Sequence, residues 1–405
     1  MYYKSRKYYT KKHNHKKHGY TRKNKKRLCK KCKINYIPSS DKDIKATIDI
    51  NALRHNINYL ANKAGTDLMP ILKADAYGHG LIDMARILRN MGIKYIGVAT
   101  LGEAILLRES GDKGRVLSWL YDIDGHEIED SLGMDLDIGI FDEKLIPRLE
   151  KMISPGKKIK VTLFVDTGIN RASIPYDKAI QAFKDVVESD KFELVGMMSH
   201  LVDAGKKDSP IVNEQLKKFR ELRENLKKIG IEPPMVHIAN TSGILNYDVS
   251  DFTISRPGGG IYGVDDGDKL NKNLKPIMTI SSYVIQLKDV DKGVGLGYEW
   301  KYVTPKKMRI AIVPIGYADI IPRSASLKLN VYINGTKRKV LGLISMDQMI
   351  VEGKKEDKIN DEVIIFGNGK NCPQTVYDVA KVSGSFPREI FCRTGYRVNR
   401  KYINR

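Results

Sequence analysis

The sequence is poor in cysteine and lacks a long apolar stretch. Only 4 of its 405 residues are Cys, which excludes a disulfide-rich scaffold and favours a reducing compartment. No apolar run approaches the roughly 18 residues that a membrane-spanning helix needs. The first residues also lack the apolar segment of a secretory signal. We therefore expect a cytoplasmic protein that does not span a membrane.

Acidic residues are absent from the first 40 positions, which hold 15 Lys and Arg. This segment leaves only +7 of the net charge of +22 to the other 365 residues, so the pI of about 9.5 does not by itself indicate a nucleic-acid-binding body. Few aliphatic side chains and many like charges predict that residues 1–43 form a disordered basic tail. Two interpretations stay open for residues 1–40. They form either an anion- or nucleic-acid-binding arm, with Tyr stacking on bases, or a solvated extension without a partner.

The tail also contains a C-x2-C pair, Cys29 and Cys32, with His13, His15 and His18 upstream. Zinc sites use these ligand types. The order is inverted relative to a zinc finger, however, and no second Cys pair follows nearby, so the spacing is weak support. We predict no metal site and keep zinc at Cys29 and Cys32 as the open alternative.

Beyond the tail, short apolar runs alternate with helical patterns up to about residue 263. Continuous apolar runs are typical of parallel strands buried on both faces. Eight of them with intervening helices predict a (β/α)8 barrel, with a doubly wound sheet as the competing layout. The first helix is predicted to begin after Asp49 or Asn51, both suitable N-caps. The strands are predicted at 68–73, 95–99, 115–120, 136–140, 160–166, 194–200, 235–240 and 252–256, and the later helices at 81–91, 102–110, 143–153, 176–188 and 211–229.

After about residue 275 the pattern changes to apolar strands separated by turn residues. Asn334-Gly335 is a signal for a two-residue hairpin turn. We predict a C-terminal antiparallel β domain, with the boundary between Gly263 and Leu274. The predicted division is a tail (1–43), a barrel (44–270) and a β domain (271–405).

The active site of such a barrel lies at the carboxyl ends of its strands. Lys73 ends the first strand, where burial lowers the pKa of an amine and suits it to act as a nucleophile, a base and a Schiff-base partner. A lone Lys at a strand end is usually just solvated. Here, however, Asn240-Thr241-Ser242-Gly243 and Gly258–Gly260 follow the last two strands, where this fold binds phosphate. A Lys facing a phosphate cradle predicts pyridoxal 5′-phosphate (PLP).

The segment ILKADAYGHG (71–80) resembles the PLP-lysine signature of alanine racemases. VDTGINR, HIANTSGIL, SRPGGGIYG, GLGYEW and ISMDQ follow in that family's order, and the resemblance covers roughly residues 44–400. It implies a barrel followed by a β domain and a PLP-dependent racemase that interconverts L- and D-alanine, usually for peptidoglycan. It also implies a homodimer in which the partner's β domain completes each site.

By this resemblance, Lys73 holds PLP and is one of two acid/base groups, the other being Tyr298 of the partner subunit. His200 matches the histidine that stabilises the tyrosine phenolate from behind the cofactor. Arg256 matches the arginine at the pyridine nitrogen, which it leaves unprotonated. The other matches are Tyr77, Thr241 and Gly258 at the phosphate, with Asn240 beside them, Arg171 and Met346 at the substrate carboxylate, and Tyr317 and Arg323 at the entrance.

Two positions depart from the family pattern. Phe164 stands where many members carry a carbamylated lysine that supports the arginine matched by Arg171. Arg388 stands where alanine-specific members have a tyrosine that contacts the phosphate and walls the side-chain pocket. Arg388 is a candidate phosphate ligand, or it points at a polar substrate side chain or to solvent. We therefore hypothesise a racemase of serine or of broader range as the alternative to an alanine racemase.

The sequence leaves two further functions as alternatives. An amino-acid decarboxylase is disfavoured because GLGYEW and ISMDQ are present and neither Cys372 nor Cys392 stands at a matching catalytic place. A protein of a different class would bind nucleic acid or another polyanion through residues 1–40, with the barrel as a relic. A salt-sensitive affinity for RNA that is lost on deleting this segment would support that function.

Overall fold

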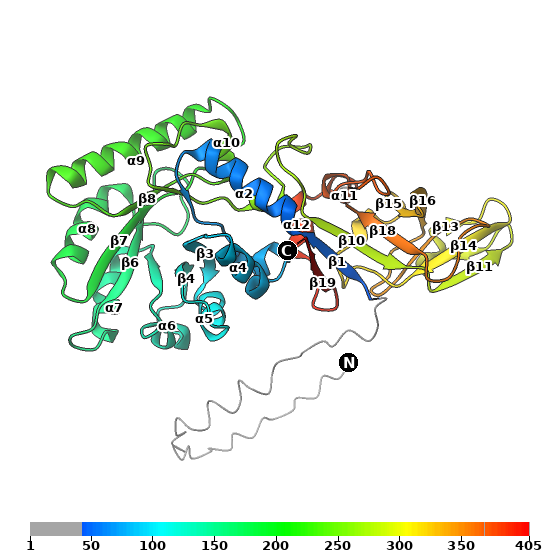
Figure 1. Cartoon of the computed structure of the whole chain (residues 1–405), viewed down its shortest axis with the longest axis horizontal. Coiled ribbons are helices and arrows are strands. Elements are labelled where there is room, and N and C mark those ends of the chain that lie inside the picture. The colour runs from blue at the N-terminus through cyan, green and yellow to red at the C-terminus, as the bar shows by residue number, and fades with distance from the viewer. Residues whose placement is uncertain (1–42, 368, 405) are drawn as a thin grey trace, which may run out of the picture. The chain divides into compact units, whose positions relative to one another are not determined.

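The structure is a computed structural model that describes residues 43–367 and 369–404. The basic tail, with Cys29 and Cys32, lies outside the described residues, so its predicted roles stay predictions. The described part contains a parallel strand array and a separate, mostly antiparallel sheet (Figure 1). Within these residues, every helix is too short or too polar to cross a membrane.

The parallel strands form a barrel, and a strand is present in each of the eight predicted segments. The first, predicted at 68–73, is shorter than expected, because it covers only Asp67–Leu68 and Lys73 begins a short helical turn instead of ending the strand. Six of them, β3 to β8, make one sheet in chain order. β9 pairs with β2, a bridge between Ile71 and Gly97 joins the β2 segment to β3, and the Arg256 N–H donates to the Ala239 carbonyl between the ends of β9 and β8. The circuit therefore closes, as a barrel requires and a doubly wound sheet does not. The strands are β2 (Asp67–Leu68), β3 (Tyr95–Thr100), β4 (Arg115–Leu120), β5 (Asp137–Ile140), β6 (Ile159–Phe164), β7 (Phe192–Met198), β8 (Met235–His237) and β9 (Ile254–Ser255).

The predicted helices are also present. α2 (Ile50–Ala64) begins after Asp49, whose carboxylate accepts the N–H groups of Asn51 and Ala52. Three short helices at 73–77, 126–131 and 241–246 were not predicted, because five or six residues are too few to show helical periodicity. The predicted helices are α4 (Leu81–Asn90), α5 (Leu101–Glu109), η1 with α7 (Glu143–Leu145, Ile146–Met152), η2 with α8 (Tyr176–Lys178, Ala179–Glu188) and α9 (Pro210–Lys228), and the others are α3 (Lys73–Tyr77), α6 (His126–Ser131) and α10 (Thr241–Asn246).

The second sheet has nine strands in the order β11-β14-β17-β16-β15-β18-β10-β1-β19. Asn334 and Gly335 both have positive φ, 49° and 72°, and connect β15 to β16, so the predicted hairpin is confirmed. Two helices, α11 (Val376–Ser383) and α12 (Pro387–Cys392), accompany the strands. The strands are β1 (Lys45–Asp49), β10 (Met278–Tyr283), β11 (Gln286–Val290), β14 (Met308–Val313), β15 (Asn330–Ile333), β16 (Thr336–Leu341), β17 (Met349–Gly353), β18 (Glu362–Phe366) and β19 (Asn399–Ile403).

The first and last strands of the described chain lie side by side in this sheet. β1 pairs with β10 in antiparallel fashion and with β19 in parallel, so the sheet is not purely antiparallel. Residues from 44 onward were predicted to belong to the barrel, whereas β1 belongs to the sheet. The division at 43/44 and 270/271 stays a prediction. The consequence for the site is that β19 reaches the segment that follows β2.

Candidate active site

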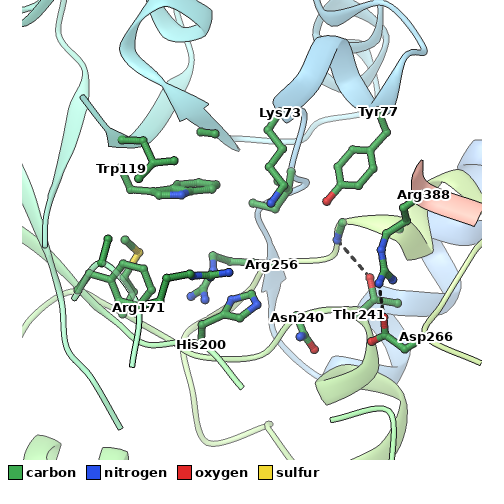
Figure 2. A pocket seen from close by; sticks show the side chains of 18 residues that line it. Lys73, Tyr77, Trp119, Arg171, His200, Asn240, Thr241, Arg256, Asp266 and Arg388 are labelled. Atoms are coloured by element: carbon green, nitrogen blue, oxygen red, sulfur yellow. Dashed lines mark hydrogen bonds and ion pairs between the residues drawn. The ribbon is translucent and has the colours of Figure 1, made fainter. Parts of the chain in front are cut away.

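A cavity of about 360 Å³ lies at the carboxyl ends of the barrel strands (Figure 2). Nine of the predicted site residues line it. Tyr298 and Met346 do not line this cavity; they lie in the C-terminal part of the chain, with 64% and 51% of their surface exposed. The nine lining residues are Lys73, Tyr77, Arg171, His200, Asn240, Thr241, Arg256, Gly258 and Arg388.

Lys73 begins a turn of unusual backbone conformation. The four residues that follow it, 74–77, have φ between 52° and 54°, so α3 is a left-handed turn. L-residues adopt this region rarely, and such backbone is found where the surrounding structure holds it. Burial lowers the pKa of Lys73, and the nearby positive charge of Arg171 lowers it further. A larger share of the amine is therefore neutral and nucleophilic than in a solvated Lys.

The glycine-rich segment after β9 forms one wall of the cavity. The N–H groups of Gly258 and Gly260 donate to the Thr241 hydroxyl, at 3.1 and 3.0 Å. A Cβ on Gly258 would lie 2.7 Å from the Tyr77 hydroxyl oxygen, so this close approach requires glycine. Burial raises the pKa of Tyr77 to about 12, so its hydroxyl stays protonated. Backbone and hydroxyl groups thus gather at this end of the cavity, as a phosphate site requires.

Arg256 lies at the base of the cavity, almost fully buried. Its guanidinium donates to the His237 carbonyl at 2.7 Å and contacts the His237 Nδ1 and the Ser199 carbonyl. Burial lowers the pKa of Arg256 to about 9, which leaves the guanidinium protonated at neutral pH. Because this cation donates to Nδ1, His237 must be neutral, and burial holds its pKa well below the usual value.

His200 lies beside Arg256 in the same part of the site (Figure 2). Burial lowers the pKa of His200 to about 3, and the charges of Arg256 and Arg171 lower it further. The imidazole is therefore neutral at physiological pH. A neutral ring next to two cations is able to accept a hydrogen bond without adding charge to the site.

Arg388 reaches the cavity from α12 and forms an ion pair with Asp266 at 2.5 Å. The Ser242 hydroxyl donates to the other oxygen of that carboxylate. Of the three destinations considered for Arg388, solvent is therefore wrong, because the guanidinium lies on the Tyr77 and Thr241 side of the cavity (Figure 2). Asp266 was not predicted, because the segment VDDGD was interpreted only as a domain boundary.

The opposite side of the cavity is apolar and aromatic. Phe164, at the end of β6, is 5% exposed and packs in the barrel interior with Met198 and Trp119. Among the residues that the structure describes, the Arg171 side chain makes no ion pair or hydrogen bond, which agrees with the loss of a carbamylated lysine at 164. Trp119 was not predicted, although it lies next to the carboxyl end of a predicted strand, where the residues that line the site of a barrel are found.

The remaining predicted residues lie together in the chain's C-terminal part but away from this cavity. Tyr298 and Trp300 lie in the short turn η4 (Tyr298–Trp300), and Trp300 is 71% exposed. Tyr317 is 39% exposed, and Arg323 lies 3.8 Å from the Glu299 carboxylate. Tyr298, Trp300 and Met346 are thus large side chains that are each more than half exposed.

Comparison with known families gives matches over nearly all of the described chain. The family described as "Alanine racemase, N-terminal domain" matches residues 48–266. The family described as "Alanine racemase, C-terminal domain" matches residues 277–402. The two matches together cover the barrel and most of the sheet.

Individual relatives agree with this result. The alanine racemase of Thermobifida fusca is 32% identical over 364 residues, 88% of this chain and 97% of that protein. The alanine racemase of Thermodesulfovibrio yellowstonii is 34% identical over 368 residues, 89% of this chain and 98% of that one. Among solved structures, the alanine racemase of Streptomyces lavendulae superposes with a TM-score of 0.84 at 31% identity and covers 91% of this chain and 98% of its own.

Proposed function

Because this chain belongs to the alanine racemase family, we propose that its cavity binds PLP and that Lys73 and Tyr298 of the partner subunit interconvert L- and D-alanine there. The chain is an isomerase, an amino-acid racemase. The proposal is carried by one observation: a Lys with a lowered pKa shares a cavity with a glycine and hydroxyl cradle. We propose the cytoplasm as its location, in keeping with the low cysteine content.

The residues present fit PLP. Lys73 offers an amine for the aldehyde, and Arg256 offers a protonated guanidinium for the pyridine nitrogen. Thr241, Tyr77 and Gly258 offer hydroxyl and backbone groups for the phosphate, and Arg388 adds a positive charge on that side. The chemistry that PLP supplies when bound is electron withdrawal from the substrate α-carbon, which makes its proton removable.

Racemisation needs two proton-transfer groups, because a proton leaves one face of the α-carbon and another arrives on the opposite face. We assign the first face to Lys73, whose neutral amine accepts or returns a proton. We assign the second to Tyr298 of the partner subunit, with His200 as the neutral partner of its hydroxyl. Arg256 keeps its own proton, so the pyridine nitrogen receives none.

The position of Tyr298 supports a homodimer with shared sites. Tyr298 and Met346 do not line the cavity of their own chain and are more than half exposed. When a second subunit packs against the surface that carries Tyr298 and Met346, both residues reach the cavity of that second subunit. Tyr298 then serves proton transfer, and the Met346 backbone binds the substrate carboxylate. Arg171 is the residue within the cavity that we assign to the same carboxylate. Tyr317 and Arg323 line the entrance in this arrangement.

Alanine is the proposed substrate, and serine or a broader range is the alternative. Arg388 lies with Tyr77 and Thr241 in the cavity, and this placement supports a phosphate role rather than one at the substrate side chain. This chain has the flexible Arg388 where alanine-specific members have a tyrosine, so the shape of that end of the cavity still differs. The alternative therefore rests on Arg388 together with Phe164.

The test begins with the full-length chain freed of PLP. We expect added PLP to give an imine absorbance band that borohydride fixes onto Lys73, and Lys73→Ala to abolish the band. Incubation with L-alanine in D2O, followed by NMR, is expected to show loss of the α-proton and appearance of D-alanine. PLP bound without proton exchange, or no PLP bound at all, would overturn the proposal.

A further inference from the structure

The left-handed turn after Lys73 is held from outside the barrel. Its residues, 74–77, have φ near 54° although none is glycine. A run of four such residues is unfavourable for an L-polypeptide and does not persist on local interactions alone. The direction of the Lys73 side chain depends on this backbone, because residue 74 follows it directly. The contacts that stabilise the turn therefore determine where the amine points.

The last strand of the chain supplies three hydrogen bonds, one to the turn and two to the residues that follow it directly. The Arg400 guanidinium, on β19, donates to the Gly78 carbonyl at 3.1 Å and to the Asp75 carboxylate at 3.0 Å. The Tyr402 hydroxyl donates to the His79 carbonyl at 2.7 Å. Arg400 and Tyr402 are two residues apart, so they lie on the same face of β19. This face of β19 contacts the turn, although the two segments are more than 300 residues apart in the sequence.

The same guanidinium is anchored in its own segment. Arg400 also donates to the carbonyls of Thr394, Gly395 and Val398, at 3.1 to 3.2 Å. A guanidinium has five N–H donors in a planar fork, and here they link two pieces of backbone to one carboxylate. Lysine has the charge but not this geometry. The contact is therefore specific for arginine.

The turn and the C-terminal segment pack so closely that few other arrangements of the two are sterically allowed. A Cβ on Gly80 would lie 2.3 Å from the Tyr402 hydroxyl oxygen, and one on Gly78 would lie 2.1 Å from the Phe391 carbonyl oxygen. Both positions also have positive φ, so glycine is required twice over. His79, fully buried between them, stacks on Tyr262 with 4.5 Å between ring centroids. Little room remains for the turn to relax in place.

The barrel side holds the other end of the turn. The Glu103 carboxylate accepts the Ala74 N–H at 2.6 Å, and its second oxygen accepts the Ala99 N–H at 2.9 Å. The Asp75 carboxylate, besides meeting Arg400, accepts the Leu81 N–H at 2.7 Å. Asp75 therefore takes part both in the contacts made by β19 and in those made on the barrel side. Loss of the β19 contacts leaves the turn attached on the barrel side alone.

We propose that Arg400 and Tyr402 are positioning residues for Lys73, which act by holding the left-handed turn in its strained backbone conformation. This inference rests on the proposed role of Lys73 as the PLP-binding residue. It makes the final strand a part of the active-site support, although neither residue lines the cavity. β1 supports the site indirectly, because it pairs with β19 along its whole length.

Three variants of the full-length chain test this proposal, namely Arg400→Gln, Arg400→Lys and Tyr402→Phe. Lys401→Gln is the matched control, because Lys401 is exposed on the other face of the same strand. The first readout is hydrogen exchange of the peptide covering 73–81, with and without PLP. We expect exchange in Arg400→Gln on the order of tenfold faster in this peptide, with the strands of the barrel unchanged. Arg400→Lys is expected to recover only part of the protection.

The second readout separates kcat from KM for alanine. A misplaced reacting group lowers the rate of chemistry by up to about a hundredfold, so we expect kcat of Arg400→Gln to fall by roughly tenfold or more while KM stays within about threefold. We expect a smaller loss for Tyr402→Phe and none for Lys401→Gln.

An active wild-type chain whose Arg400 and Tyr402 variants show neither faster exchange nor a lower kcat would overturn this inference and leave the proposed function intact. A global rise in exchange or a lower melting temperature with unchanged kcat would show a merely structural role. An inactive wild-type chain would instead overturn the proposed function, while the exchange readout would still test the turn.

Discussion

The Arg388 guanidinium lies 2.5 Å from the Asp266 carboxylate, at the end of the cavity that Tyr77 and Thr241 line. The Ser242 hydroxyl donates to the same carboxylate. An acid at a phosphate site is unfavourable unless a cation compensates it. On the proposed function, Arg388 neutralises Asp266 and also offers N–H donors to the phosphate.

The first prediction concerns PLP affinity. Charge-assisted hydrogen bonds contribute about 1.5–3 kcal/mol, and about 1.4 kcal/mol is tenfold in affinity. We expect Arg388→Met to weaken PLP binding by roughly tenfold to a hundredfold, since it removes the cation and leaves Asp266 uncompensated. The double variant with Asp266→Asn is expected to bind PLP more tightly than Arg388→Met alone. Equilibrium dialysis of PLP measures both, and equal affinity in all variants would contradict the assignment.

The second prediction concerns the substrate range. If the flexible Arg388 leaves more room than an aromatic wall, Arg388→Tyr is expected to raise the alanine-to-serine ratio of kcat/KM by several-fold. A difference of about one small group in a pocket is worth roughly 10–200-fold in selectivity at most. The measurement is the rate of D-isomer formation from L-alanine and L-serine. An unchanged ratio would remove Arg388 from the explanation of specificity.

The third prediction concerns pH and stability. Burial lowers the pKa of His79 to about 3, against 6.5 in the unfolded chain. Below pH 6.5 the unfolded chain binds a proton that the folded chain does not, so the free energy of unfolding falls as the pH drops from 6.5 towards 3. The slope is about 1.4 kcal/mol per pH unit for each such group. His200, with a pKa of about 3, adds a second.

This prediction is measured by urea unfolding of the PLP-free chain between pH 7 and pH 5. His79→Asn keeps an N–H donor near the carbonyls of residues 76 and 77, to which the ring donates. We expect this variant to be less stable at pH 7 through lost stacking, but with a shallower slope, by about 1.4 kcal/mol per pH unit below pH 6. His126→Asn, at an exposed position, is the matched control. An identical slope in wild type and His79→Asn would show that His79 is not the group concerned.

Much of the barrel could be predicted from the sequence because its strands are buried on both faces and appear as continuous apolar runs. β4 was predicted at 115–120 and lies at Arg115–Leu120. Lys73 was predicted to end the first strand, whereas β2 ends at Leu68 and Lys73 begins α3. Its place at the cavity was still predicted, because the segment after a barrel strand faces the site. β1 was missed although its buried Ala46 and Ile48 alternate with less buried residues at the period of a strand. The segment was interpreted only as the start of the region that leads into the first helix.

Other features of the site depend on contacts between distant segments and leave no local pattern. The left-handed turn after Lys73 is held by Arg400, and nothing in the sequence ADAY predicts positive φ. Asp266 gains its role only through Arg388, which lies on a helix in the C-terminal part of the chain. The resemblance to a family aligned Arg388 with the cavity but could not supply its acidic partner.

Mixing two inactive variants shows whether each active site is shared between the two subunits. Lys73→Ala and Tyr298→Phe each remove one acid/base group, so each homodimer is expected to lose activity by about a hundredfold or more. When the two variants are dissociated and reassociated in equal amounts, random pairing makes half of the dimers hybrids, and each hybrid has one intact site. We predict recovery of about a quarter of wild-type alanine racemisation on this symmetric pairing. No recovery on mixing, or full activity of Tyr298→Phe alone, would show that the active site is not shared in this way.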